Sequence, residues 1–246
     1  MLSAFPVYCR TPKPETLLKE FRAPLDFLGV FGAIDELKNL RSGDGRKIML
    51  LPGYTVGPAY LAPLEKYLNW KGYDAFEWGL GRNDGDFDSY ACVIGENLKR
   101  EFYEDGQKIT LVGHSLGGAI AREVARQHGE YVQEVITLGT PIVGGAKYTI
   151  LAEQYAATHG INIEELEEEV HRRNSEGIRC PITAIYSRED GFIDWRAARD
   201  IYNAQARNIE VTSSHMGMPL SAPVWKEISN ALTRNTPNKR SQNLLN

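Results

Sequence analysis

The sequence predicts an α/β fold, with a mostly parallel sheet flanked by helices. From Lys47 onward, short apolar runs rich in Ile, Val and Leu alternate with longer segments that have the apolar spacing of helices. The apolar runs show no polar alternation, which is typical of parallel strands buried on both faces. In such a sheet we expect a functional site at the carboxyl ends of the strands.

The expected elements follow one another in chain order. Strand candidates are 48–51, 73–78, 109–112, 132–138, 182–186 and 209–212. Helix candidates are 59–70, 89–102, 120–128 and 223–232. The candidate 109–112 is a continuous apolar run ended by Gly113, and the helix at 223–232 begins with a proline, which suits the first turn of a helix.

The N-terminal segment departs from this alternation. Residues 1–46 have a helical apolar pattern, and we expect them to form an extension that packs its apolar side chains against the sheet: Leu17, Phe21, Leu25, Leu28, Ile34 and Leu37. The alternative is transient contact with a membrane or lipid surface through Phe27, Leu28, Val30 and Phe31.

Two further segments also depart from the alternation of strands and helices. Residues 144–177 lie between two expected strands and contain an acidic helix at 163–173. This segment is too long for a simple crossover, so we expect a small helical cap or lid inserted into a domain that spans residues 47–234. Residues 235–246 form a polar C-terminal tail.

Composition narrows the classes of function. The net charge is −4, so no basic surplus indicates a nucleic-acid partner. Cys9, Cys92 and Cys180 are far apart and form neither a disulfide framework nor a zinc set. No apolar stretch is long enough for a membrane span, and the first residues lack the pattern of a secretory signal. We therefore expect a cytoplasmic location.

The strongest motif lies between an expected strand and an expected helix. Gly113-His114-Ser115-Leu116-Gly117 matches G-x-S-x-G and is followed by Gly118. The small glycines allow a sharp turn that exposes the serine Oγ at the end of the strand, and the next helix directs its N-terminus to the developing oxyanion. Ser115 is the candidate nucleophile. The alternative is an ordinary glycine-rich turn in which this serine caps the helix.

This motif resembles the nucleophile elbow of the lipase and esterase branch of the α/β-hydrolases. The run Thr137-Leu138-Gly139-Thr140-Pro141 is similar to the strand end that follows the nucleophile helix in that branch. The run Leu50-Leu51-Pro52-Gly53-Tyr54 is similar to its oxyanion loop, with Pro52 in place of the usual histidine. The resemblance covers about residues 47–232 and implies an α/β-hydrolase fold with a catalytic triad.

The candidate base is His215. A serine hydroxyl needs a positioned base to act as a nucleophile at neutral pH. Of the five histidines, His215 alone follows a late strand, and the chain order of serine, acid and histidine also fits this fold. His114 lies inside the elbow and is expected to point away from the serine face.

The candidate acid lies in the loop after strand 182–186. Asp190 and Asp194 are both possible partners for the base, and Glu189 is a third. The resemblance to lipases favours Asp190, which precedes a glycine and an apolar pair. Asp194 is then expected to cap a helix that starts at Trp195.

Backbone N–H groups are the expected oxyanion donors. The resemblance implies the N–H groups of Leu116 and Tyr54, with Thr55 as an alternative for the second. No metal site is expected, because the loop 84–88 lacks the Gly and Glu positions of a calcium loop and no other cluster has ligand spacing. No cofactor is required.

These observations predict a serine esterase or lipase that acts on a small-molecule or lipid ester through an acyl-enzyme. An acyltransferase or thioesterase would use the same triad with a different acceptor or leaving group. A third possibility is a hydrolase fold that only binds a ligand or partner. The sequence does not fix the oligomeric state.

Overall fold

A parallel sheet forms the centre of the molecule. The structure, a computed structural model, describes residues 8–234. Its sheet has the order β2-β1-β3-β4-β5-β6, and every neighbouring pair is parallel. The strands are β1 (Lys47–Leu51), β2 (Asp74–Glu77), β3 (Ile109–His114), β4 (Val132–Leu138), β5 (Ile182–Ser187) and β6 (Arg207–Val211). The predicted fold class is therefore confirmed.

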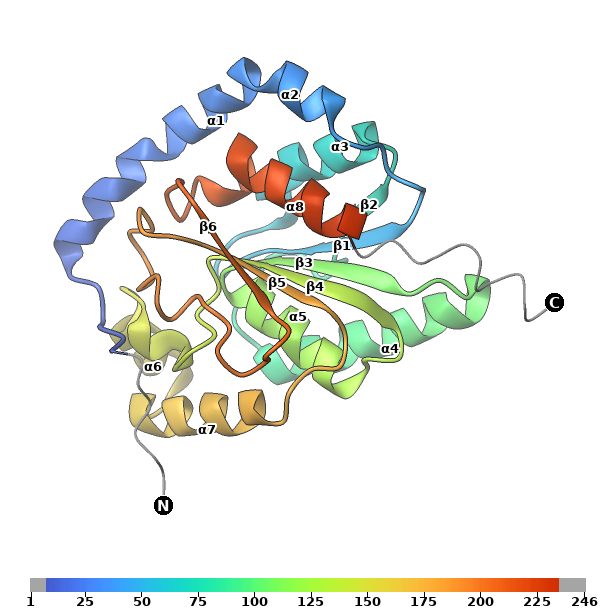
Figure 1. The fold of residues 1–246 in the computed structure, drawn as a ribbon. Helices are drawn as coiled ribbons and strands as arrows, with labels where there is room; N and C mark the ends of the chain where they lie inside the picture. The colour runs from blue at the N-terminus through green and yellow to red at the C-terminus, as the bar shows by residue number, and fades with distance from the viewer. Residues whose placement is uncertain (1–7, 235–246) are drawn as a thin grey trace.

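Helices cover both faces of this sheet (Figure 1). One face carries α3 (Ala62–Trp70) and α8 (Ala222–Arg234), and the other carries α4 (Phe87–Asp105) and α5 (Leu116–Gln127). Alternate side chains of one strand enter opposite cores: Ile48 packs on the α8 side and Met49 on the α4 side. Both are buried, which explains why the strands show continuous apolar runs.

Several boundaries differ from the sequence predictions. The expected helix at 59–70 divides into a 3-10 turn (Pro58–Tyr60) and α3, whose first turn contains Pro63. The helix expected at 120–128 begins earlier, at Leu116, directly after the Ser115 turn. The glycines of this turn obscured the helix start in the sequence, because glycine disfavours a helix interior.

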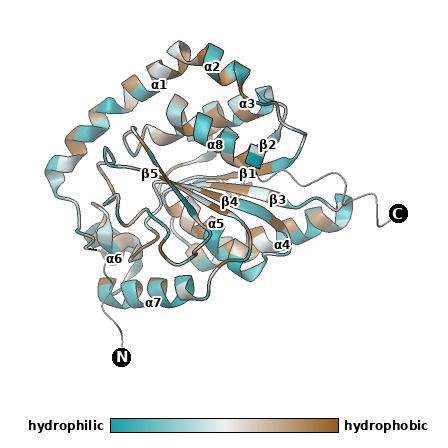
Figure 2. Cartoon of the chain, in the orientation of Figure 1, coloured by the Kyte–Doolittle hydropathy of each residue, from teal (hydrophilic) through white to brown (hydrophobic). Residues whose placement is uncertain are grey.

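The segment between β4 and β5 is helical, as expected for a cap. It contains a 3-10 turn (Gly145–Tyr148), α6 (Ala152–His159) and α7 (Ile163–Ser175). The Asn162 side chain caps α7 by accepting the N–H groups of Glu164 and Glu165. Hydrophilic residues dominate α7, whereas hydrophobic residues gather on the central strands (Figure 2).

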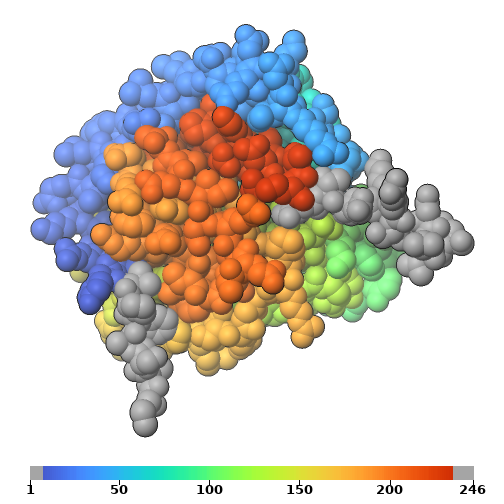
Figure 3. Space-filling view, viewed as in Figure 1, coloured from blue at the N-terminus to red at the C-terminus, as the bar shows by residue number. Residues whose placement is uncertain are grey.

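The N-terminal segment forms an outer arm rather than a layer on the sheet. It contains a 3-10 helix η1 (Pro14–Arg22), α1 (Ala23–Gly32) and α2 (Ile34–Asn39). In the space-filling view this arm lies along the surface of the C-terminal part of the chain (Figure 3). We refer to residues 8–39 as the N-terminal arm.

The expectation that this arm buries its apolar residues is wrong for most of them. Val30 and Leu37 are buried in the core that contains α8. Nine other large apolar or aromatic side chains are exposed: Tyr8, Leu17, Leu18, Phe21, Leu25, Phe27, Leu28, Phe31 and Ile34. The physical reason is that the inward face is partly polar, with Asp26 buried in the position that an apolar residue would otherwise take.

Neither a disulfide nor a helix that could cross a membrane is present in residues 8–234. Cys9, Cys92 and Cys180 are all free. Among the helices of residues 8–234, none combines the length and the apolar character that a bilayer crossing needs. The tail that was expected at 235–246 lies outside the described residues.

Candidate active site

Ser115 lies on a strained turn at the carboxyl end of β3. Its backbone has φ 53° and ψ −124°, a region that residues with a Cβ rarely adopt. A Cβ on Gly113 would collide with the backbone of Gly117 and Gly118, so this chain crossing requires glycine. The turn is held because Ser115 N–H donates to the carbonyl of Leu138 at 2.9 Å.

The loop after β1 lies directly against Ser115. A Cβ on Gly53 would approach the Ser115 Cβ to 3.1 Å, so glycine permits the close contact. Within residues 8–234, no acceptor is recorded for the N–H groups of Tyr54 and Leu116. The N–H of Thr55 donates to the carbonyl of Asn83 at 2.6 Å, so this alternative oxyanion donor is already used.

His215 and Asp190 form a buried pair. His215 Nδ1 lies 2.8 Å from Asp190 Oδ2, and both side chains are almost fully buried. The other oxygen of Asp190 accepts the N–H groups of Phe192 and Ile193, each at 2.8 Å. These bonds fix the carboxylate, and the carboxylate in turn fixes the orientation of the imidazole.

The pKa of His215 reflects opposing effects. Burial lowers it, but the charge and hydrogen bond of Asp190 and the charge of Glu20 raise it. The net result is a pKa above the ordinary value of 6.5. The arrangement therefore favours a protonated imidazole more than free histidine does.

Asp194 has a different environment. Its Oδ2 accepts the N–H of Arg10 at 2.7 Å, and its Oδ1 accepts the N–H of Arg196 at 3.0 Å. The expectation that it caps a helix at Trp195 is wrong, because residues 195–198 form turns. Asp194 instead caps a turn and ties the N-terminal arm to it.

His114 lies closer to the site than the sequence suggested. Its Nε2 is 3.0 Å from the carbonyl oxygen of His215, and the two rings lie 4.7 Å apart. Burial, followed by the charge of His215, holds the pKa of His114 well below its ordinary value. A neutral His114 therefore donates from Nε2 to this carbonyl and supports the His215 loop. No sequence signal separates this role from a buried histidine in general.

Ser115 and His215 open on one cavity of about 590 Å³. The cap covers much of it with apolar side chains: Leu151, Tyr155, Ile161, Leu166 and Val170. Within the described chain, no hydrogen bond joins Ser115 Oγ to the His215 ring. In enzymes without substrate, catalytic hydrogen bonds are often long and tighten only in the complex.

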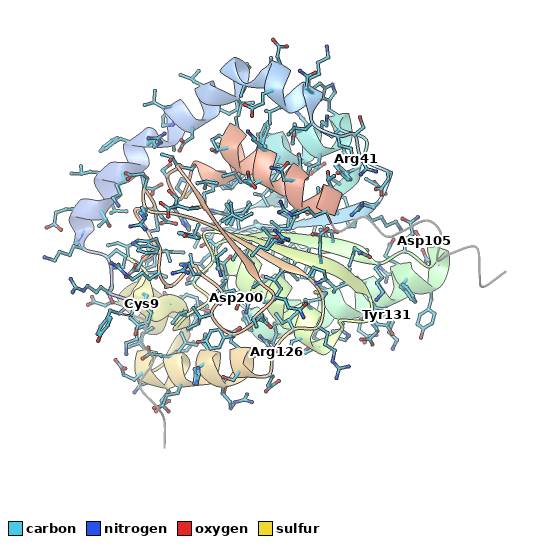
Figure 4. All side chains as sticks on the ribbon, in the orientation of Figure 1. Cys9, Arg41, Asp105, Arg126, Tyr131 and Asp200 are labelled. Atoms are coloured by element: carbon cyan, nitrogen blue, oxygen red, sulfur yellow. The ribbon has the colours of Figure 1, made fainter. Side chains whose placement is uncertain are left out.

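The other end of the cavity is polar and anchors the cap. Arg122 of α5 forms a buried ion pair with Asp200 at 2.7 Å. Asn174 of α7 accepts from Arg122 and Arg126, at 3.1 and 3.0 Å. Figure 4 shows Arg126 and Asp200 in the region between α5 and α7. Sequence reasoning missed this network, because its members are distant along the chain.

No group of three or more His, Cys, Asp or Glu side chains within 8–234 is arranged to hold a metal ion. The hydrogen bonds of Asp190 and His215 are instead directed at each other and at the backbone.

Comparisons with known proteins agree with this architecture. A family described as the α/β-hydrolase fold matches residues 103–159, which include the Ser115 turn. No curated protein matches the chain.

Three solved structures share the fold at low identity. A structure of the metagenome-derived lipolytic enzymes LipS and LipT has 14% identity and a TM-score of 0.57, covering 80% of this chain and 95% of that one. A soluble variant of monoglyceride lipase from Saccharomyces cerevisiae has 14% identity and a TM-score of 0.59, with coverage of 81% and 90%. Bacillus licheniformis lipase BlEst2 has 18% identity and a TM-score of 0.60, with coverage of 79% and 94%. Sheet, elbow and comparisons together show that this chain has the α/β-hydrolase fold.

Proposed function

We propose that the protein is a serine hydrolase that cleaves carboxylic esters. One observation carries the proposal: the strained Ser115 and the buried His215–Asp190 pair come from three separate strand ends, and Ser115 and His215 line one cavity. Holding a serine in such a backbone region destabilises the fold by about 1–3 kcal/mol. Backbone strain of this kind is typical of active sites.

The reaction proceeds in two halves. Ser115 Oγ attacks the ester carbonyl carbon while its proton passes to Nε2 of His215, and Asp190 stabilises the imidazolium. The N–H groups of Tyr54 and Leu116 donate to the oxyanion. When the intermediate collapses, the C–O bond to the alcohol breaks and His215 returns the proton to the leaving alkoxide, which leaves an acyl group on Ser115.

Water completes the cycle. His215 accepts a proton from the water molecule, whose oxygen attacks the acyl carbonyl, and the acid is released as Ser115 regains its proton. An alcohol or thiol in place of this water would give acyl transfer instead. The apolar cap side chains suit the acyl part of the substrate, because they remove hydrocarbon from water.

Hydrolysis of p-nitrophenyl acetate, butyrate and longer esters tests the proposal. We expect activity in the wild type and loss of nearly all of it in Ser115→Ala and His215→Ala. Equal turnover of a thioester, or faster transfer to an added alcohol, would assign the acyltransferase or thioesterase alternative. Absence of turnover together with no labelling by a fluorophosphonate would favour a non-catalytic binding protein.

We also propose that the N-terminal arm rests on an anionic lipid surface. The exposed side chains of Phe21, Leu25, Leu28 and Phe31 form an apolar face larger than scattered surface residues would give. Between Asp26 and Asp35 the chain has no charged residue, so the outer face of α1 is apolar throughout.

The charges around this face favour an anionic surface over a second copy of the chain. Arg10 and Lys13 are exposed, and the exposed Arg22 forms an ion pair with Asp26 Oδ1 at 3.0 Å. The Glu20 carboxylate turns inward. Glu15 is the remaining acid between residues 8 and 34. The excess of cations is therefore confined to residues 8–22, which carry four cations and two acids, whereas the exposed acids Asp35 and Glu36 follow the apolar face.

Vesicle co-sedimentation tests this second proposal. We expect the protein to bind phosphatidylcholine vesicles containing phosphatidylglycerol better than pure phosphatidylcholine vesicles. Phe21→Ser and Leu25→Ser should weaken binding, and Tyr103→Ser, an exposed aromatic on α4, should not. Equal binding by all variants, or no binding by the wild type, contradicts a lipid role, and a dimer dissociated by Phe21→Ser assigns the face to a second copy.

A further inference from the structure

One carboxylate of the N-terminal arm binds both loops of the candidate acid–base pair. Glu20 Oε1 accepts the N–H of Gly191 at 2.8 Å and the N–H of His215 at 3.0 Å. Its Oε2 accepts the N–H of Met216 at 2.8 Å. Gly191 directly follows Asp190, so Glu20 bridges the loop after β5 and the loop after β6.

Other contacts of the arm strengthen this bridge. Thr16 Oγ1 donates to the carbonyl of Gly191 at 2.7 Å. The buried Asp26 accepts the N–H and the hydroxyl of Ser214, each at 2.9 Å. The arm therefore binds the residues next to Asp190 and next to His215 through buried or half-buried polar groups. Breaking these hydrogen bonds would leave the groups unpaired, which costs free energy.

Two glycines permit the close approach. A Cβ on Gly191 would lie 2.8 Å from Glu20 Oε1 and 2.6 Å from the carbonyl of Thr16. A Cβ on Gly217 would collide with the Asp26 carboxylate. Both glycines have ordinary backbone angles, so the space that they leave, and not their conformational freedom, explains why glycine is present.

We propose that Glu20 is a positioning residue for the reaction. It holds the loops of Asp190 and His215 at the separation that their 2.8 Å contact needs, and so makes the N-terminal arm a part of the active-site framework. This inference rests on the proposed ester hydrolysis, because it gives Glu20 a role only through Asp190 and His215.

The charge of Glu20 acts on the base as well. The groups that face His215 are Asp190 from the β5 loop, Glu20 from η1 and His114 from the end of β3. Asp190 and Glu20 raise the pKa of His215, whereas burial lowers it. Removing the Glu20 charge therefore lowers the pKa of His215, an effect that a purely structural contact would not produce.

The test compares Glu20→Gln with Glu15→Gln, an exposed acid of the same helix. Glu20→Gln keeps the side-chain size but replaces an acceptor oxygen by a donor. We expect kcat for p-nitrophenyl butyrate to fall about 10- to 100-fold with little change in KM, since small misplacements of reacting groups have effects of this size. The acidic limb of the pH profile should move to lower pH, and Glu15→Gln should match the wild type.

An NMR titration of the His215 ring gives a second readout that needs no turnover. Glu20→Gln should lower the pKa of His215 relative to the wild type and to Glu15→Gln. Unchanged kcat and an unchanged His215 pKa in a folded Glu20→Gln protein overturn the positioning role while leaving the hydrolase proposal intact. An inactive wild type with a shifted His215 pKa overturns the hydrolase proposal but keeps the contact of Glu20 with the base.

Discussion

The hydroxyl of Thr140 donates a hydrogen bond of 3.0 Å to the carbonyl oxygen of Ser115. This bond joins the end of β4 to the turn after β3. The same hydroxyl occupies the space that a Cβ on Gly118 would need, so Thr140 and Gly118 fit each other. The turn is thus stabilised by a hydrogen bond from the end of the neighbouring strand, in addition to the space that its own glycines leave.

Thr140→Val should loosen this turn. Ser115 O keeps the hydrogen bond from Gly118 N–H, so we expect a loss of about 0.5–1.5 kcal/mol in the free energy of unfolding, as for one hydrogen bond. Urea denaturation measures it. Thr140→Ser keeps the hydroxyl and serves as the control, and equal stability of the wild type and Thr140→Val would contradict a supporting role.

Asp190 and Asp194 should differ sharply in their effect on activity. Asp190→Asn removes the charge that stabilises the His215 imidazolium, so we expect kcat to fall by about 10³–10⁴-fold, as for triad acids in general. Asp194→Asn should change kcat less than tenfold, because its oxygens bind backbone N–H groups of Arg10 and Arg196. The reverse order would assign Asp194 as the acid.

The pH profile should show a raised acidic limb. The base must be neutral to accept the Ser115 proton, and the pKa of His215 lies above 6.5. We therefore expect kcat/KM to fall as the pH drops through an apparent pKa above that value. Initial rates between pH 5 and 9 measure it, and a limb centred well below 6.5 contradicts the described environment of His215.

The cap should set the acyl preference. Val170→Phe fills part of the cavity next to the cap, so we expect kcat/KM for long p-nitrophenyl esters to fall at least tenfold, with the acetate ester little affected, since misfit in an apolar pocket has effects of this size. Val170→Ile, which adds only one methylene group, is the control. An equal loss for all chain lengths would place the acyl chain elsewhere.

The sheet and the elbow were predictable because their signals are local. The inner strands β1, β3 and β5 are mostly apolar and buried, although the edge strands β2 and β6 contain polar residues. The glycines around Ser115 satisfy a steric need that any chain crossing of this kind has. Asp190 and His215 also follow their strands directly, so the topology brings them to one edge of the sheet. The fold class follows from these local features.

The N-terminal arm was not predictable in the same way. Its periodic apolar residues favour core packing, yet Phe21 and Leu25 face outward. The inward face is fixed by Glu20 and Asp26, whose partners lie in loops far along the chain. The spacing of apolar residues in a sequence indicates a helix face. It does not indicate which carboxylates will be buried and accept hydrogen bonds from backbone N–H groups.

The proposed hydrolase activity depends most on Ser115 as the nucleophile. The direct test is to quench the protein during turnover of p-nitrophenyl butyrate, and separately after treatment with a fluorophosphonate, and to locate the added mass by peptide mass spectrometry. We expect a butyryl or phosphonyl group on Ser115 in the wild type, and none in Ser115→Ala or in heat-denatured protein. An unmodified Ser115 peptide in an active sample, or a label on another residue, would contradict it.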